Sequence, residues 1–316
     1  MSTDDTKLVE HREYSTIERQ MIDGRPVYVK KHLPNAAWQT PSLVRDQVAR
    51  DVQIVNCLAT WARPTMRLGV MKIVEHDFNN AQVTIEEVPG EPLYDVLRYA
   101  DRQTLNVSCV RALHLAGKWS RFFQSLPIDD GLVHSTPNNP EDLVEHCELR
   151  LQRLSELGYP WPNAAIRARM LGWLRRQVDA TPKEHLKRVW SHGDFGPFNM
   201  IWDHRTLTPI DFASSATDLP LVDVTYLIHR LEMLPIEFPW RTWPVALWRK
   251  ACLRGYGMPE ADELPIYRAL MVRRLLSHLK KLVERKPATT ARTWHTRWCR
   301  RWIRVKLVRL IQGQTG

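Results

Sequence analysis

The chain has 316 residues and a formal net charge of +10 at pH 7, with 45 Lys or Arg against 35 Asp or Glu. This length leaves room for two lobes around one cleft. No uncharged apolar run approaches the about 20 residues that a bilayer-spanning helix needs. The residues near the start are acidic, which argues against a secretion signal. The 5 cysteines are scattered, so no pair has the spacing of a metal site. We therefore expect a cytoplasmic globular protein.

Two strands joined by a tight turn are predicted near the start of the chain. Asp23-Gly24, between residues 17–21 and 26–30, is among the strongest sequence signals for a two-residue hairpin. Side chains alternate along a strand, so Lys30 and the valines before it point to opposite faces. The valines can then enter the core while the lysine faces a ligand.

A helix and a second pair of strands come next. Residues 41–60 carry apolar side chains at helical spacing, with Asp51 near the middle. Residues 71–76 and 81–88 have the composition of strands, and a polar turn separates them. The first part of the chain is thus predicted to be a small antiparallel sheet with one helix.

The rest of the chain is predicted to be mainly helical. Apolar residues recur at helical spacing in six segments, 111–126, 143–157, 164–178, 219–231, 243–254 and 265–284. The fold class expected is α+β, with an N-terminal lobe over residues 1–90 and a helical C-terminal lobe over residues 91–316.

The segment that starts at His192 holds the side chains most informative about function. It reads His-Gly-Asp-Phe-Gly-Pro-Phe-Asn, and Ile-Asp-Phe follows at 210–212. Two short hydrophobic runs around a polar turn predict a hairpin that brings Asn199 and Asp211 together, with Asp194 on the loop before it. One carboxylate to take a hydroxyl proton, and an amide with a second carboxylate to hold Mg²⁺, suit phosphoryl transfer.

This combination resembles the aminoglycoside phosphotransferase and choline kinase family, whose fold is the two-lobe fold of protein kinases. The resemblance implies that Asp194 is the catalytic base and that Asn199 and Asp211 bind Mg²⁺. It also implies that His192 packs within the loop and that Asp223 braces the loop from the start of a helix. The alternative is a set of ordinary turn residues, but four polar residues in the family's order and spacing rarely arise by chance.

The resemblance extends to the nucleotide-binding part. Val27-Tyr28-Val29-Lys30 is similar to the Val-Ala-Ile-Lys strand of kinases, which implies that Lys30 holds the phosphates of ATP. Asp51 is implied as the partner of Lys30, at a place where the family usually has the longer Glu. An exposed helix acid is the alternative for Asp51.

Residues 84–93 resemble the hinge of the family, where backbone groups meet the adenine. The resemblance implies that Glu86, Glu87 and Val88 form this contact zone. No glycine-rich phosphate loop is visible, and residues 11–16 lie where such a loop would be.

The end of the chain is basic and rich in tryptophan. A helix over 288–312 would place four arginines on one face and an apolar set on another, namely Arg297, Arg300, Arg301 and Arg304 against Trp294, Trp298, Trp302 and Val305. Such a helix is typical of an anionic membrane surface. The alternative is that the tryptophans pack on the C-terminal lobe, and nucleic-acid binding is a third reading of a basic, aromatic stretch.

The charge also bears on the acceptor, because a basic chain is poorly suited to a polycation such as an aminoglycoside. We expect a kinase that uses ATP and Mg²⁺ to phosphorylate a hydroxyl of a sugar or alcohol, with a cell-envelope glycolipid such as a lipopolysaccharide core sugar as the favoured acceptor, at the inner face of the membrane. The alternatives are a soluble aminoglycoside, choline or metabolite kinase and a catalytically silent scaffold on a kinase fold. His229, Arg230 and Glu232 are candidates for the acceptor pocket.

Overall fold

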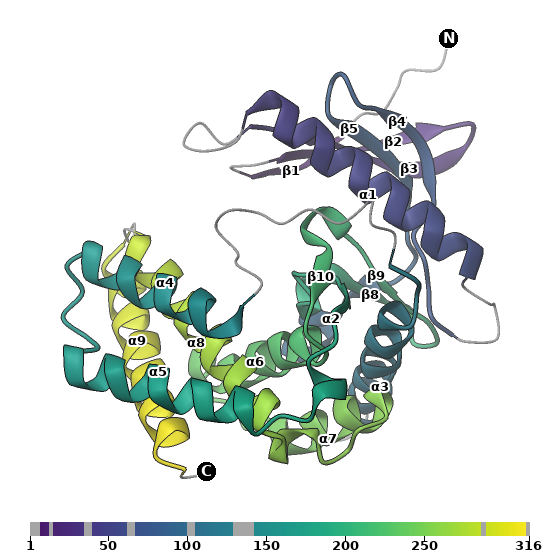
Figure 1. Cartoon of the computed structure of the whole chain (residues 1–316). Helices are drawn as coiled ribbons and strands as arrows, with labels where there is room; N and C mark the ends of the chain where they lie inside the picture. Colours follow the sequence, from purple (N-terminus) through teal and green to yellow (C-terminus); the bar gives the residue numbers. More distant parts are fainter. Residues whose placement is uncertain are drawn as a thin grey trace.

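The protein consists of a small sheet with one helix above a larger helical body (Figure 1). The computed structural model describes residues 7–12, 15–34, 40–61, 67–99, 105–128, 142–285 and 289–313.

The sheet among the described residues is antiparallel, with the order β1-β2-β3-β5-β4. Its strands are β1 (Lys7–Arg12), β2 (Ser15–Ile22), β3 (Arg25–His32), β4 (Ile73–Asp77) and β5 (Gln82–Glu86). The β2–β3 turn has φ of 49° at Asp23 and 72° at Gly24. Two successive positive φ angles are those of the predicted two-residue hairpin, which is confirmed.

Helix α1 (Pro41–Trp61) joins the sheet to the helical body. Its first half packs on the sheet, where Val48 and Val52 form a small core with Val83 of β5. Its second half contributes Ile54 and Leu58 to the main core of the chain. One rigid helix therefore links the packing of both parts.

The chain crosses to the helical body after β5, close to two small sheets. β6 (Glu91–Pro92) pairs with β8 (Met200–Trp202), β8 pairs with β9 (Leu207–Pro209), and β7 (Val189–Ser191) pairs with β10 (Ala216–Asp218). At the crossing, Gly90 has φ of 120°, and a Cβ there would lie 2.5 Å from the Trp202 carbonyl oxygen. Only glycine fits this approach without a shift.

The body is built from α2 to α9. Their bounds are α2 (Leu93–Tyr99), α3 (Leu105–Gln124), α4 (Leu143–Glu156), α5 (Ala164–Asp179), α6 (Val222–Glu237), α7 (Val245–Tyr256), α8 (Pro265–Glu284) and α9 (Thr290–Ile311), with 3₁₀ turns η3 (Lys183–His185), η4 (Pro197–Asn199), η5 (Phe212–Ser214) and η6 (Ala261–Glu263). The six predicted helices are present with shifted ends, since α3 begins earlier and α6 continues past Pro235. No described helix is long and apolar enough to cross a membrane.

Helix α9 packs on the body through one face and leaves another in solvent. Ile303 and Leu307 are fully buried in the main core. Trp294 and Trp298 are 67% and 53% exposed, whereas Trp302 is partly buried and its ring lies 6.4 Å from that of His229. The expected single tryptophan face is therefore divided, because the third tryptophan turns toward α6.

Helices α3 and α7 approach each other closely through two glycines. A Cβ at Gly117 of α3 would lie 2.0 Å from the Cys252 carbonyl oxygen, and one at Gly255 of α7 would lie 1.8 Å from the His114 carbonyl oxygen. Both neighbours are backbone atoms of helices, so neither can yield locally. The contact requires glycine on both sides.

We expect Gly117→Ala to lower the free energy of unfolding by about 2 kcal/mol because the helices must separate. Gly172→Ala on α5 is the matched control, since its Cβ would meet nothing nearer than 3.6 Å. The control should gain up to about 1 kcal/mol from helix propensity. Urea denaturation measures both, and equal gains in the two variants would contradict the close contact.

Candidate active site

The loop after β7 is held by one buried carboxylate. Asp223, in the first turn of α6, accepts hydrogen bonds from Ser191 Oγ at 2.8 Å, His192 N at 2.8 Å and Gly193 N at 3.2 Å. Its side chain is inaccessible to solvent. Burial raises the pKa of Asp223, although His192 and these donors act in the opposite direction. The structure places Asp223 where it can brace the loop.

His192 and Gly193 fix the loop against the segment that carries Asp211. His192 Nε2 lies 3.1 Å from the Ile210 carbonyl oxygen, and its ring centroid is 4.7 Å from that of Phe212. Gly193 has φ of 78°, and a Cβ there would lie 2.1 Å from the Ser214 carbonyl oxygen. His192 is thus a packed residue within the loop.

Asp194 lies next to Asn199 on the far side of the loop. Asn199 Nδ2 donates to Asp194 O and to Asp194 Oδ2, both at 3.0 Å. The Tyr226 hydroxyl of α6 also bonds to the Asp194 carboxylate, and this bond adds to the effect of burial and of the Asp194 charge in raising the pKa of Tyr226. Asp194 therefore has a fixed orientation. Tyr226 was not expected from the sequence.

The β8–β9 hairpin brings Asp211 to the same place, as predicted. Ile210 N donates to the Asn199 carbonyl oxygen at 2.9 Å, so Asp211 follows directly. Lys30 Nζ of β3 lies 2.7 Å from Asp211 Oδ1 across the two parts of the chain. Burial alone would raise the pKa of Asp211, but Lys30, with His32 and His192, outweighs it and lowers that pKa.

Asp51 occupies a different position from the one expected. The described residues show no ion pair between Lys30 and Asp51, because Lys30 pairs with Asp211 instead. Asp51 Oδ1 accepts from Phe212 N at 2.9 Å and is 1% exposed. Burial raises the pKa of Asp51 to about 7, and the nearby charge of Lys30 only partly offsets this. Asp51 thus holds α1 against the backbone next to Asp211.

The donor set at this point fits a magnesium ion that is also held by phosphates. Asn199 uses Nδ2 for Asp194, which leaves its Oδ1 as a ligand beside the carboxylate of Asp211. Amide and carboxylate oxygens are the ligands that Mg²⁺ prefers, and protein sites often supply only one or two of them. Within the described ranges no group of three or more His, Cys, Asp or Glu could hold a metal alone.

The expected hinge residues lie between β5 and the crossing. The Glu86 side chain pairs with Lys72 at 2.9 Å, and the Glu87 side chain pairs with Arg19 at 2.8 Å. Glu86 N and Glu87 N also donate to carbonyls of the N-terminal part. In the described chain, Val88 N has no backbone acceptor. Of these three residues, Val88 is therefore the one whose backbone N–H remains available to a ligand.

The expected phosphate-covering segment falls on the β1–β2 hairpin. Residues 13–14, between the two strands, lie outside the described residues. Ser15 is buried in β2.

The three helix residues proposed for the acceptor pocket have separate surroundings. His229 is buried, with Nε2 at 2.9 Å from His278 Nδ1. Glu232 pairs with Lys306. Only Arg230 reaches the loop, where its guanidinium lies 4.9 Å from the ring centroid of Phe198.

Phe198 adds an aromatic surface to the site. It is 42% exposed and stacks on Tyr94 of α2 with ring centroids 4.1 Å apart. Its position within the loop motif was a signal that sequence reasoning could have used. Tyr94, in contrast, could not be placed beside it without the fold.

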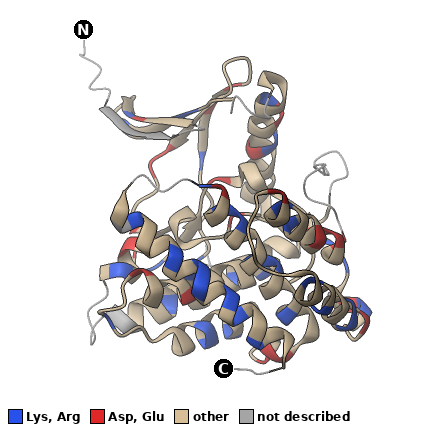
Figure 2. Ribbon diagram, turned by 90° about the vertical axis from the view of Figure 1, so that its left-hand side faces the viewer, with Lys and Arg blue, Asp and Glu red and all other residues tan. Residues whose placement is uncertain are grey.

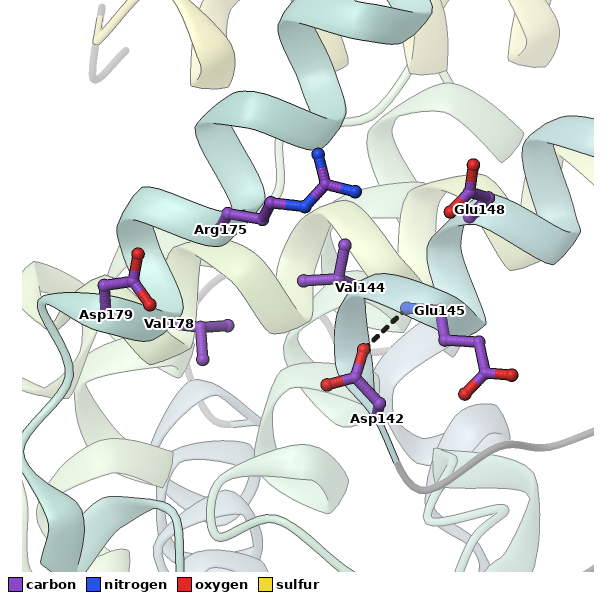
Figure 3. A pocket seen from close by; sticks show the side chains of 7 residues that line it. All are labelled: Asp142, Val144, Glu145, Glu148, Arg175, Val178 and Asp179. Atoms are coloured by element: carbon purple, nitrogen blue, oxygen red, sulfur yellow. Dashed lines mark hydrogen bonds between the residues drawn. The ribbon is translucent and has the colours of Figure 1, made fainter.

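A hollow of about 370 Å³ lies between the first turns of α4 and the last turns of α5, away from the residues described above. Asp142, Glu145, Glu148 and Asp179 surround it, with Arg175 above (Figure 3). Asp142 caps α4 by accepting from Glu145 N at 2.7 Å. No residue of the loop or hairpin contributes to its lining.

Comparison with known proteins agrees with this geometry. Residues 81–270, more than half of the chain, match the model of the phosphotransferase enzyme family. No curated protein matches the sequence.

Several solved structures have the same fold. A thermostable mutant of aminoglycoside phosphotransferase APH(4)-Ia has a TM-score of 0.63 and 14% identity, over 99% of this chain and 95% of that one. Amicoumacin kinase hAmiN, in complex with AMP-PNP, Ca²⁺ and Ami, has a TM-score of 0.61 and 12% identity, over 95% and 88%. The streptomycin–ATP complex of APH(2")-IIa has a TM-score of 0.59 and 13% identity, over 88% and 84%.

The raised pKa of Asp51 makes the stability of the fold depend on pH. The folded state holds this proton up to about pH 7, whereas the unfolded chain loses it near 3.8. The contribution of the protonated carboxyl is thus complete below about pH 4 and is lost as the pH rises to about 7, at about 1.4 kcal/mol per pH unit. We expect the unfolding free energy of Asp51→Asn, relative to wild type, to rise between pH 5 and pH 7.

Urea denaturation at several pH values measures this difference. Asp46→Asn, an exposed position on the same helix, is the matched control and should give a flat difference. A flat difference for Asp51→Asn as well would show that Asp51 keeps an ordinary pKa.

Proposed function

The chain belongs to the phosphotransferase enzyme family, and from that premise we propose that it is a kinase that uses ATP and Mg²⁺ to phosphorylate a hydroxyl of a sugar or alcohol. One observation carries the proposal. Three separate segments meet at one place through direct contacts: β3 with Lys30, the loop with Asp194 and Asn199, and the end of the β8–β9 hairpin with Asp211. This set supplies a cation for phosphates, a base and two oxygen ligands.

In this proposal each residue has one task. Asp194, held by Asn199 and Tyr226, orients the acceptor hydroxyl and takes its proton on a carboxylate oxygen. Lys30 holds the ATP phosphates, and the backbone from Glu86 to Val88 faces the adenine. Asn199 and Asp211 would hold Mg²⁺, which when bound neutralises charge on the transferred phosphoryl group.

The structural neighbours support the choice of nucleotide. Their structures include complexes with AMP-PNP, ADP and ATP, and two others with GDP. We propose ATP for this chain. The small molecules in their complexes, among them hygromycin B, kanamycin, streptomycin and Ami, support a small-molecule acceptor in general.

For the acceptor we propose a glycolipid of the cell envelope, such as a lipopolysaccharide core sugar, reached at the inner face of the membrane. The exposed face of α9 supports this choice. Trp294, Trp298 and Val305 are 67%, 53% and 45% exposed, and exposed Arg297 and Arg301 lie beside them. Exposed tryptophan with arginine favours the headgroup layer of an anionic membrane.

We expect Asp194→Asn to lower turnover by about 10²–10⁴-fold while Mg²⁺-dependent ATP affinity changes little, because a base is lost and the nucleotide contacts remain. Asp179→Asn, exposed at the end of α5, is the control and should keep full activity. Steady-state kinetics and calorimetry measure the two effects. Equal loss of turnover and affinity would indicate that the site collapses.

Asp211→Ala should remove the magnesium dependence of ATP binding, since the variant loses one of the two metal ligands. Calorimetric titration with ATP in the presence and absence of Mg²⁺ measures this dependence. If the ATP affinity of the wild-type chain does not depend on Mg²⁺, the catalytically silent scaffold is favoured.

Full-length protein should sediment with vesicles that contain phosphatidylglycerol. Truncation of α9 is unsuitable as a test because Ile303 and Leu307 belong to the core. The double variant Arg297→Glu/Arg301→Glu should weaken vesicle binding by about tenfold or more, at about 1 kcal/mol per cation. Trp240→Ala, at a residue 75% exposed elsewhere, is the control. Absence of binding by wild type would favour soluble acceptors.

A further inference from the structure

We propose that the acceptor carries an anionic group, a phosphate or a carboxylate, close to the hydroxyl that it presents to Asp194, and that Lys281, Arg274 and Arg230 recognise this group. This inference rests on the proposed kinase function and narrows its substrate class. Nothing in the catalytic role of Asp194, Asn199 and Asp211 requires these cations.

The three cations lie on the side of Asp194 that α6 and α8 form. Arg230 is one turn after Tyr226 on α6, and Lys281 is two turns after Arg274 on α8. The Arg274 guanidinium lies 4.7 Å from the ring centroid of Tyr226, whose hydroxyl bonds to Asp194. The main charge interaction of Lys281 is with Asp194 itself.

The described part of the protein neutralises these cations poorly. Arg230 forms an ion pair with Glu237, with Nη2 and Oε1 3.6 Å apart. Among the described residues no carboxylate forms an ion pair with Arg274 or Lys281. Other nearby carboxylates are already used, since Asp218 binds Arg273 at 2.7 Å and Asp223 braces the loop.

The two guanidinium groups make few hydrogen bonds. Nε of Arg230 and Nε of Arg274 have no hydrogen-bond partner in the described chain, and Arg274 Nη2 donates to the Val222 carbonyl oxygen at 3.2 Å. Partial burial, together with Arg274, Arg285 and Lys280, lowers the pKa of the solvent-accessible Lys281, although Asp194 acts against this shift. Cations gathered in this way attract an anion, and planar guanidinium groups bind phosphate or carboxylate well.

The arrangement is poorly suited to a polycation. A cationic acceptor beside Asp194 would meet Lys281 and Arg230, both positive. The acidic hollow between α4 and α5 is lined by none of these residues (Figure 3). Lys and Arg are spread over the helices of the body (Figure 2). The charge of the acceptor side therefore favours an anion.

A binding experiment with the full chain tests the inference. With saturating AMP-PNP and Mg²⁺, which occupy the nucleotide site, calorimetry is run with glucose 6-phosphate, glycerol 3-phosphate and glucuronate as anionic probes. Glucose is the neutral counterpart and kanamycin the cationic one. We expect at least one anionic probe to bind, while glucose and kanamycin bind at least tenfold more weakly.

Charge reversal identifies the site of binding. Lys281→Glu should lower the affinity for the anionic probe by at least about tenfold, as expected for a lost charge-assisted hydrogen bond. Lys281→Gln should lower this affinity less. Lys250→Glu, exposed on α7, changes the net charge equally and should leave the affinity unchanged.

The outcomes separate the two proposals. Failure of AMP-PNP to bind with Mg²⁺ would overturn the proposed kinase function. Normal nucleotide binding with preference for kanamycin, with no anionic probe bound, or with anion affinity unchanged in Lys281→Glu would overturn only the anionic acceptor.

Discussion

The carboxylate of Asp223 is the constraint on which the site depends. Three donors from consecutive residues, Ser191, His192 and Gly193, converge on this one buried group. A buried carboxylate without such donors would be very costly, so the loop and the start of α6 must stay together. Everything that follows Gly193 along the loop, including Asp194, takes its position from this contact.

A second constraint joins the two parts of the chain. Lys30 belongs to the sheet and Asp211 to the body, and they pair at 2.7 Å. Asp51 supports the same point from α1 through Phe212 N. Asp211 also has φ of 68°, a left-handed conformation that costs a non-glycine residue about 1 kcal/mol or more. The contacts around Asp211 offset this strain and hold its carboxylate against Lys30.

The sequence was sufficient for the features that depend on local pattern. The Asp23-Gly24 turn, the six helices and the hairpin between Asn199 and Asp211 were predicted because their signals lie within a few residues. The partner of Lys30 was not, since a strand and a helix give no distance between side chains. The shorter Asp51 bonds to a backbone amide, and no motif distinguishes that contact from an ion pair.

The residues proposed to face the acceptor could not be brought together from the sequence either. Tyr226 and Arg230 on α6 meet Arg274 and Lys281 on α8, about fifty residues later in the chain. Each of the four is an ordinary helix residue in the sequence. Phe198 was visible within the loop motif, but its contact with Tyr94 depends on the crossing at Gly90.

The cations near Asp194 are the basis of the acceptor that we propose for this chain. The similar solved structures, at 12–14% identity, share the architecture, and this degree of likeness leaves the acceptor open. A shared fold does not fix the substrate. In our proposal the fold holds the base and the metal ligands in place, and side chains on α6 and α8 select the acceptor. In the proposed acceptor site, Arg230, Arg274 and Lys281 would repel a polycation. In our proposals the basic acceptor side and the exposed basic face of α9 favour the same kind of substrate, an anionic molecule at an anionic surface.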